Sequence, residues 1–258
     1  MNAIDLRQGR WQDALADVRE VDALITDPPY GERTHSGQRH GRREGRERAE
    51  GGRWVSARGI DYDAMNAQLI EELVSHWSDR VRGWFVAFTS HDLVPAYEAA
   101  LESAGRYVFA PLPAVQIGMN CRLAGDGPSN WTTWIVVARP RKRRRWGTKP
   151  GAYIGNPFDP GQNTATSTRR SSVVGSKPLW LMRALVTDYS QPGDVICDPY
   201  AGGASTLIAA ASLKRTALGA EVDADTHAYA QQRCADWLST PISTEGGQQL
   251  NWLAEVDS

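Results

Sequence analysis

The sequence predicts an α/β domain built on a mostly parallel β-sheet. Short apolar runs alternate with segments of helical periodicity along most of the 258 residues, the pattern of strands joined by helical crossovers. Two of the apolar runs end directly at an Asp-Pro pair, one at Asp27 and one at Asp198. Ligands of open α/β sheets bind beyond the carboxyl ends of the strands, so both pairs lie where chemistry is expected.

The first half of the chain predicts three strands and two helices. The run that ends at Asp27 is apolar throughout, and residues 63–77 place their apolar side chains at helical spacing. The expected elements are a short edge strand at 2–6, strands at 22–26 and 83–89, and helices at 63–77 and 91–104.

Between these elements, residues 31–58 are rich in Gly, Arg and Glu and hold almost no large apolar side chain. Such a segment cannot bury enough surface to fold alone, so we expect a mobile loop. A lid that orders on nucleic acid and a plain insertion are both compatible with this composition.

The second half predicts an antiparallel strand pair followed by alternating helices and strands. Residues 241–258 are weakly patterned, and we expect a frayed tail. The expected elements are strands at 106–115 and 131–138, a helix at 176–189, a strand at 194–197, a helix at 204–213, a strand at 216–221 and a helix at 225–238.

Composition indicates a cytoplasmic protein without a metal. Hydrophobic content of 41% and charged content of 23% are ordinary for a soluble domain, and no apolar run approaches the roughly 18 residues of a membrane helix. The N-terminus lacks the features of a signal peptide. Cys121, Cys197 and Cys234 are scattered without Cys-x-x-Cys spacing, which argues against a disulfide framework and a zinc site.

The net charge of −1 conceals a basic segment. Between Arg139 and Lys177 the chain holds ten Lys and Arg residues and a single acid, Asp159. A polyanionic partner and a solvated charged loop both fit this segment. The residues that would contact a nucleic acid are Arg141, Lys142, Arg143, Arg144, Arg145, Arg169 and Arg170.

Asp27-Pro28-Pro29-Tyr30 resembles the catalytic tetrapeptide of enzymes that methylate exocyclic amines of nucleobases. Such an amine is a poor nucleophile, because its lone pair is delocalised into the ring. The Asp27 carboxylate and the Pro28 carbonyl could accept its two hydrogens, while the prolines hold the backbone and Tyr30 stacks on the flipped base. The alternative without a catalytic role is that these four residues form a turn followed by a loop.

The turn from Asp198 to Gly203 resembles the S-adenosylmethionine (SAM) loop of the same enzymes. A strand ends, glycines allow close backbone approach, and a helix N-terminus follows with free amide donors. Glu221 ends the next strand, where a carboxylate can hold ribose hydroxyls, and Ser176-Lys177-Pro178 resembles the motif that meets the methionine carboxylate. The cofactor-binding residues are therefore expected to be Lys177, Pro178, Asp198, Pro199, Tyr200, Gly202, Gly203, Thr206 and Glu221.

The tetrapeptide precedes the cofactor loop, and this order is similar to that of β-group DNA amino-methyltransferases. The resemblance implies a circularly permuted, Rossmann-like SAM-dependent methyltransferase fold. Its divisions would be a catalytic half at 1–138, a target-recognition segment at 139–175, a SAM-binding half at 176–240 and the tail at 241–258.

The same resemblance implies a DNA adenine-N6 methyltransferase, because Asp rather than Ser stands at position 27. Double-stranded DNA would be the substrate, and a homodimer and a cognate restriction enzyme are partners that the family implies. Cytosine-N4 methylation, RNA base methylation and an inactive nucleic-acid-binding homologue are the alternatives.

Two positions depart from the family pattern. Ala204 replaces the last glycine of the cofactor loop, and Gly9-Arg10 stands where the family usually has Gly-Asp, whose acid holds the adenine of the cofactor. That adenine contact is either lost or made by Asp5, Gln8 or backbone groups.

Overall fold

The computed structural model describes residues 3–31, 47–48, 54–55, 64–117, 130–142, 146–155 and 176–239. Most of the predicted 31–58 loop and the predicted tail therefore lie outside the described residues. Of the loop, the backbone of β3 (Glu47–Arg48) and β4 (Trp54–Val55) is described as a two-residue antiparallel pair. Among the described helices, none has the length and apolar character needed to cross a membrane.

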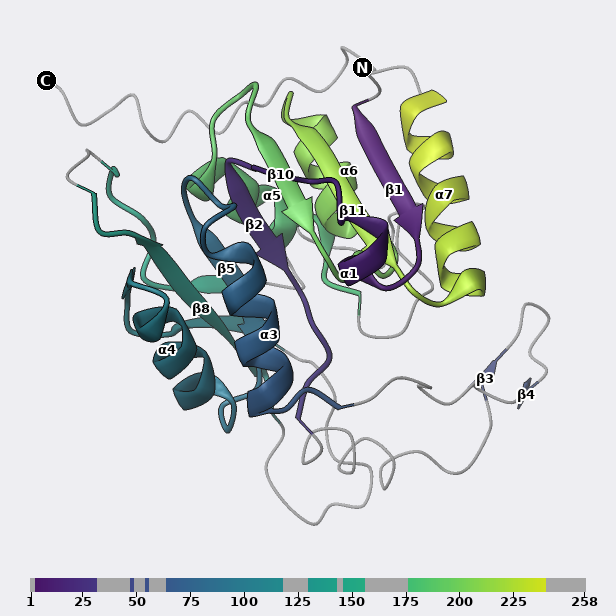
Figure 1. The fold of residues 1–258 in the computed structure, drawn as a ribbon. Coiled ribbons are helices and arrows are strands. Elements are labelled where there is room, and N and C mark those ends of the chain that lie inside the picture. The colour runs from purple at the N-terminus through teal and green to yellow at the C-terminus, as the bar shows by residue number, and fades with distance from the viewer. Residues whose placement is uncertain are drawn as a thin grey trace, which may run out of the picture.

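A nine-stranded sheet forms the centre of the molecule (Figure 1). Its order is β1-β11-β10-β2-β5-β8-β7-β9, and β6 pairs with β8 beside β7. The first five strands in this order are mutually parallel, and β8 runs antiparallel to β5. The strands are β1 (Ile4–Gln8), β2 (Ala23–Thr26), β5 (Phe85–Thr89), β6 (Arg106–Val108), β7 (Leu112–Gln116), β8 (Thr132–Pro140), β9 (Tyr153–Gly155), β10 (Val195–Asp198) and β11 (Thr216–Glu221).

Helices cover both faces of this sheet, with two hydrophobic cores between the layers (Figure 1). One core joins α5, α6 and α7 to one face, and the other joins α1, α3 and α4 to the opposite face. Strand β5 is buried along its whole length and supplies both cores, with alternate side chains pointing to opposite faces. The helices are α1 (Trp11–Ala14), α3 (Ala67–Trp77), α4 (Val94–Ser103), α5 (Leu179–Tyr189), α6 (Ser205–Ser212) and α7 (Ala224–Ser239).

The predicted strand at 106–115 is divided into β6 and β7 in the structure. Between them Phe109 still donates its backbone N–H to Val137 of β8, but Pro111 has no N–H to donate. The predicted helix at 63–77 begins four residues later, at Ala67. There the Asn66 side chain accepts from the Leu69 amide at 3.0 Å, which is an N-cap. The antiparallel pair itself is present.

Candidate functional site

The two predicted motifs lie side by side at one end of the sheet. Strands β2 and β10 are adjacent and parallel, with Ala23 opposite Ile196, so Asp27 and Asp198 emerge at the same edge. The Thr26 hydroxyl donates to the Asp198 carboxylate at 2.6 Å and links the two strand ends directly. The fold therefore brings the predicted catalytic tetrapeptide and the predicted cofactor loop into one site.

Asp27 is held by two side chains. The Lys177 Nζ lies 2.6 Å from Asp27 Oδ2, and the Tyr30 hydroxyl donates to Asp27 Oδ1 at 3.1 Å. Burial alone would lower the pKa of the Lys177 ammonium, but the adjacent Asp27 carboxylate outweighs burial and raises it. Burial and the Asp27 charge together raise the pKa of the Tyr30 hydroxyl. A lysine expected to face the cofactor thus contacts the catalytic carboxylate.

The rest of the tetrapeptide packs against neighbouring segments of the chain. Pro28 is buried, Pro29 and Tyr30 are half-buried, and the Tyr30 carbonyl accepts the Met65 amide at 3.2 Å. A Cβ on Gly31 would meet the Asp92 carboxylate at 3.0 Å, so the backbone passes close to the β5–α4 connection. These contacts fix the path of the chain on both sides of Asp27.

The cofactor loop is built around a buried carboxylate. Asp198 is 1% exposed, and it accepts the Tyr200 amide at 3.1 Å in addition to the Thr26 hydroxyl. Burial raises the pKa of Asp198 to about 6, although hydrogen bonds from Thr206 and Thr26 oppose the rise. Gly219 of the next strand allows the loop to pack closely, because a Cβ there would lie 2.9 Å from the Leu207 side chain.

The Asp198→Asn variant is expected to change how stability depends on pH. The folded protein holds the Asp198 proton more tightly than the unfolded chain, whose carboxyl has a pKa near 3.8. The protonated Asp198 carboxyl therefore makes its full contribution to the free energy of unfolding below pH 3.8. This contribution is lost as the pH rises through about 6. Between these limits the free energy of unfolding of the wild type should fall by about 3 kcal/mol relative to Asp198→Asn.

Urea unfolding of both proteins across this pH range measures the difference. The exposed carboxylate Asp13 supplies the control, Asp13→Asn, which should follow the wild type at every pH. If the difference in free energy of unfolding between the wild type and Asp198→Asn stays constant with pH, the raised pKa of the Asp198 carboxyl is contradicted.

Ala204 adopts the left-handed conformation that glycine usually supplies. Its φ is 61° and its ψ 27°, and it stands directly before α6. Its methyl group is fully buried in the core rather than exposed at the loop surface. The substitution therefore stores about 1–2 kcal/mol of backbone strain without placing a side chain over the cofactor loop.

Glu221 connects the cofactor loop to the edge of the sheet. Its carboxylate accepts the Gly202 amide at 2.9 Å and the Asp223 amide at 2.9 Å, and its backbone carbonyl accepts the Gly9 amide. Burial raises the pKa of Glu221. The carboxylate thus lies at the end of β11, where a role in holding ribose was predicted, and that role stays a prediction.

The loop from Asp198 to Gly203 also contacts a residue that the sequence did not single out. Trp11, the first residue of α1, donates its indole N–H to the Tyr200 hydroxyl at 3.1 Å. This contact attaches the cofactor loop to the segment that carries the unusual Gly9-Arg10 pair. No pattern in the sequence joins Trp11 to Tyr200, because the pairing depends on β1 and β10 lying in one sheet.

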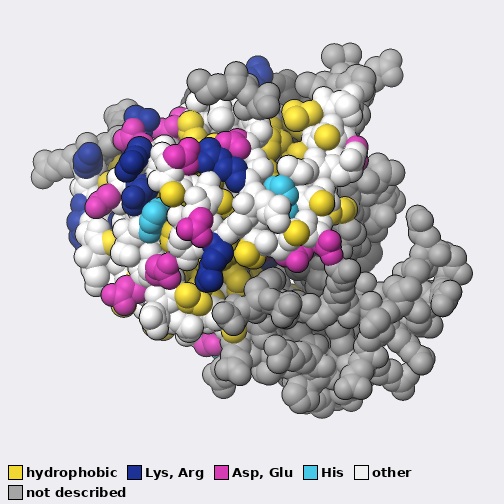
Figure 2. Space-filling view, turned by 45° about the vertical axis from the view of Figure 1, so that its right-hand side comes forward, with side chains coloured by type: hydrophobic (Ala, Val, Ile, Leu, Met, Phe, Trp, Pro, Cys, Tyr) yellow, Lys and Arg dark blue, Asp and Glu magenta, His cyan; other side chains and the backbone are white. Residues whose placement is uncertain are grey.

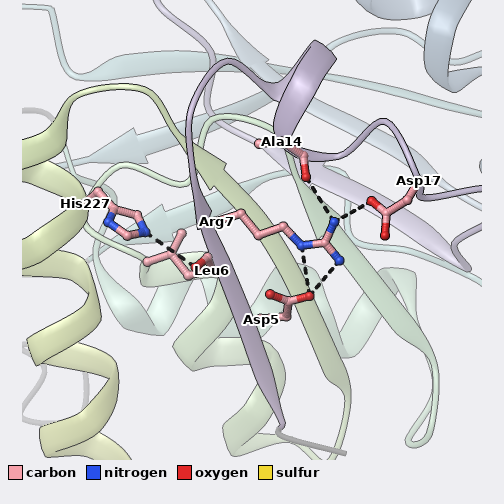
Figure 3. A network of polar contacts seen from close by, with 6 residues as sticks. All are labelled: Asp5, Leu6, Arg7, Ala14, Asp17 and His227. Atoms are coloured by element: carbon pink, nitrogen blue, oxygen red, sulfur yellow. Dashed lines mark hydrogen bonds and ion pairs between the residues drawn. The ribbon is translucent and has the colours of Figure 1, made fainter.

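Asp5 is already engaged by Arg7, as Figure 3 shows. The Arg7 guanidinium donates to Asp5 at 2.8 Å, and also to Asp17 and to the Ala14 carbonyl. This network fastens the edge strand β1 to α1. Among the groups considered for the adenine contact, Gln8 lies opposite Glu221 at the end of β1.

Two described residues of the basic segment, Arg141 and Lys142, lie away from Asp27. Strand β8 is antiparallel to β5, so its last residue, Pro140, lies at the opposite end of the sheet from the catalytic tetrapeptide. Arg141 and Lys142 follow Pro140 and are exposed there. The remaining predicted nucleic-acid contacts, Arg143, Arg144, Arg145, Arg169 and Arg170, lie outside the described residues.

The face drawn in Figure 2 mixes Lys and Arg with Asp and Glu, and its described part holds no continuous basic area. In the described part of the chain, no group of three or more His, Cys, Asp and Glu side chains could hold a metal ion. Gly155, which precedes residues 156–175, lies at the catalytic end against the Trp180 ring. Both described ends of that stretch, Gly155 and Ser176, therefore flank the site.

Residues 132–232 match the family model N6_N4_Mtase, described as DNA methylase. The matched span includes Lys177, Asp198 and Glu221. The resemblance to the DNA amino-methyltransferases is confirmed. No curated protein is matched by the sequence.

Solved DNA methyltransferases share the fold. The M1.HpyAVI–SAM complex has a TM-score of 0.64 at 18% identity, over 89% of this chain and 98% of that one. The modification methylase TTHA0409 of Thermus thermophilus, complexed with SAM, has a TM-score of 0.58 at 19% identity, over 91% and 94%. The cytosine-N4-specific PvuII methyltransferase has a TM-score of 0.57 at 13% identity, over 90% and 88%. The α/β methyltransferase fold is thus confirmed, while its circular permutation stays a prediction.

Proposed function

We propose that this protein is a SAM-dependent DNA methyltransferase that transfers a methyl group to the N6 amine of adenine. The observation that carries the proposal is the junction of two motifs: Asp27, with Lys177 and Tyr30, lies beside the buried Asp198 of the cofactor loop. The family match and the SAM complexes of similar fold support the choice of cofactor and substrate.

The residues of the loop fit the cofactor. The N-terminus of α6 offers backbone amides, the Glu221 carboxylate, which accepts the Gly202 amide, keeps lone pairs for hydroxyl groups, and Lys177 offers a cation for a carboxylate. Bound SAM would supply an electrophilic methyl group. Asp27 would accept a hydrogen of the target amine and turn the nitrogen toward that methyl, and the Tyr30 ring would support the flipped base.

Cytosine-N4 methylation is the second candidate, since the PvuII enzyme of similar fold is cytosine-N4-specific. The deciding experiment incubates unmethylated duplex DNA with SAM and the protein, digests the DNA to nucleosides and identifies the product by mass spectrometry. Detection of N6-methyldeoxyadenosine supports the proposal, and detection of N4-methyldeoxycytidine supports cytosine-N4 methylation instead. Bound SAM without a DNA product points to RNA, and absence of SAM binding points to an inactive homologue.

Replacing Arg141 and Lys142 together by glutamine is expected to weaken DNA binding without changing the rate at saturating DNA. Both side chains are exposed and lie at the end of the sheet opposite Asp27, so their contacts would be to phosphates. The slope of log K against log salt should fall by about 1–2. The control is the double variant Arg183→Gln and Lys214→Gln, which removes the same charge from exposed positions. If both double variants lose DNA affinity equally, the loss results from the change in net charge and not from contacts of Arg141 and Lys142.

A further inference from the structure

Both carboxylate oxygens of Asp27 contact neighbouring side chains. Oδ2 faces the Lys177 ammonium at 2.6 Å, and Oδ1 accepts the Tyr30 hydroxyl at 3.1 Å. A carboxylate paired with an ammonium is a weaker acceptor for a further donor, because the cation already compensates its charge. Asp27 is therefore poorly prepared to receive the amine of a target base while it is paired with Lys177.

Lys177 is enclosed more tightly than Asp27, whose side chain is 23% exposed. Its side chain is 10% exposed, and its Nζ lies 5.0 Å from the centre of the Tyr30 ring and 4.9 Å from that of Phe88. Within the described residues, Asp27 is the carboxylate with which Lys177 forms a salt bridge. An enclosed ammonium needs an anion beside it, because an uncompensated charge in such surroundings is strongly unfavourable. Lys177 can leave Asp27 only when another anion replaces that carboxylate.

The amino-acid carboxylate of the cofactor is such an anion, and Lys177 lies two residues before α5, in contact with Asp27. We propose that Lys177 is a positioning residue that couples the two substrates: it holds Asp27 until the cofactor carboxylate engages the ammonium, and Asp27 is then released to accept the target amine. This inference rests on the proposed function and adds an order of events to it.

The exchange has a thermodynamic consequence. If the cofactor carboxylate and Asp27 compete for one ammonium, each lowers the affinity of Lys177 for the other. Cofactor binding then favours binding of the flipped base, and by reciprocity the base favours the cofactor. The protein would therefore bind its cofactor first and then bind the flipped base in the position for methyl transfer.

The test removes the competing charge and measures cofactor affinity by calorimetry. In Asp27→Asn, Lys177 has no carboxylate to give up, so S-adenosylhomocysteine should bind about tenfold more tightly than to the wild type. This ligand keeps the carboxylate but lacks the sulfonium charge, which removes any direct attraction between Asp27 and the sulfur. The second ligand, 5′-methylthioadenosine, lacks the carboxylate, and its affinity should be the same in both proteins.

A gain for both ligands, or for neither, would overturn the inference. Asp27→Ser is measured in parallel, in case the unpaired Lys177 prevents Asp27→Asn from folding, and circular dichroism verifies that each variant is folded. Tyr30→Phe serves as the control, because it removes the second contact of Asp27 and leaves the ion pair. Failure of the wild type to bind S-adenosylhomocysteine would contradict the proposed function itself. Normal binding and methylation without the selective gain would contradict the coupling alone.

Discussion

Methyl transfer by Asp27→Ala is expected to be about 10²–10⁴-fold slower than by the wild type, with the cofactor still bound. Under the proposed function, the Asp27 side chain supplies the acceptor that turns the target amine toward the methyl group, whereas the loop proposed to hold the cofactor lies between β10 and α6. Asp27→Asn keeps an amide oxygen as acceptor but lacks the negative charge. We therefore expect its rate to lie between those of Asp27→Ala and the wild type.

Single-turnover transfer of a radiolabelled methyl group to duplex DNA measures these rates without interference from product release. Asp13→Asn, which removes an exposed carboxylate from α1, provides the matched control and should transfer at the wild-type rate. An Asp27→Ala protein that methylates DNA as fast as the control would exclude Asp27 as the catalytic acceptor.

A large loss of stability is expected when Arg106 is replaced, because Arg106 is a buried cation that contacts no carboxylate among the residues that the structure describes. Its side chain is 3% exposed, and its guanidinium donates to the Gly83 carbonyl at 2.9 Å and to the Val81 carbonyl at 3.0 Å. Burial lowers the pKa of Arg106 to about 10, so the group stays charged at neutral pH. These bonds satisfy carbonyls in the turn between α3 and β5, which Arg106→Met would leave without a donor.

We expect Arg106→Met to lower the free energy of unfolding by about 3 kcal/mol, since each hydrogen bond from a charged donor contributes roughly 1.5–3 kcal/mol and removal of the buried charge offsets part of the loss. The melting temperature should fall by about 6–12 °C. Arg82→Met is the control, because Arg82 is a neighbouring arginine that is 59% exposed and pairs with Glu20 at the surface. Denaturant unfolding of both variants measures the difference, and equal stabilities would contradict the role of Arg106.

The two motifs could be predicted from the sequence because each depends on short-range features. An apolar run ending at Asp-Pro places Asp27 and Asp198 at strand ends, and alternation of strand and helix patterns predicts that those strands are parallel. That β2 and β10 are neighbours is seen only in the structure. The same local signals predicted β11 with its bounds unchanged, from Thr216 to Glu221. Adenine specificity, the recognition segment and the DNA contacts remain predictions, because much of residues 139–175 lies outside the described structure.

The partners of individual side chains depend on the tertiary structure. Lys177 was assigned to the cofactor by its motif, yet it lies 2.6 Å from Asp27, because the start of α5 and the end of β2 meet at the same edge of the sheet. Arg141 follows an antiparallel strand, so its charge lies at the end opposite the catalytic carboxylate. Sequence patterns with a period of two or 3.6 residues specify which face of an element is buried. They carry no information on which residues from distant segments meet, and strand order and direction alone decided that Lys177 contacts Asp27 and that Arg141 does not.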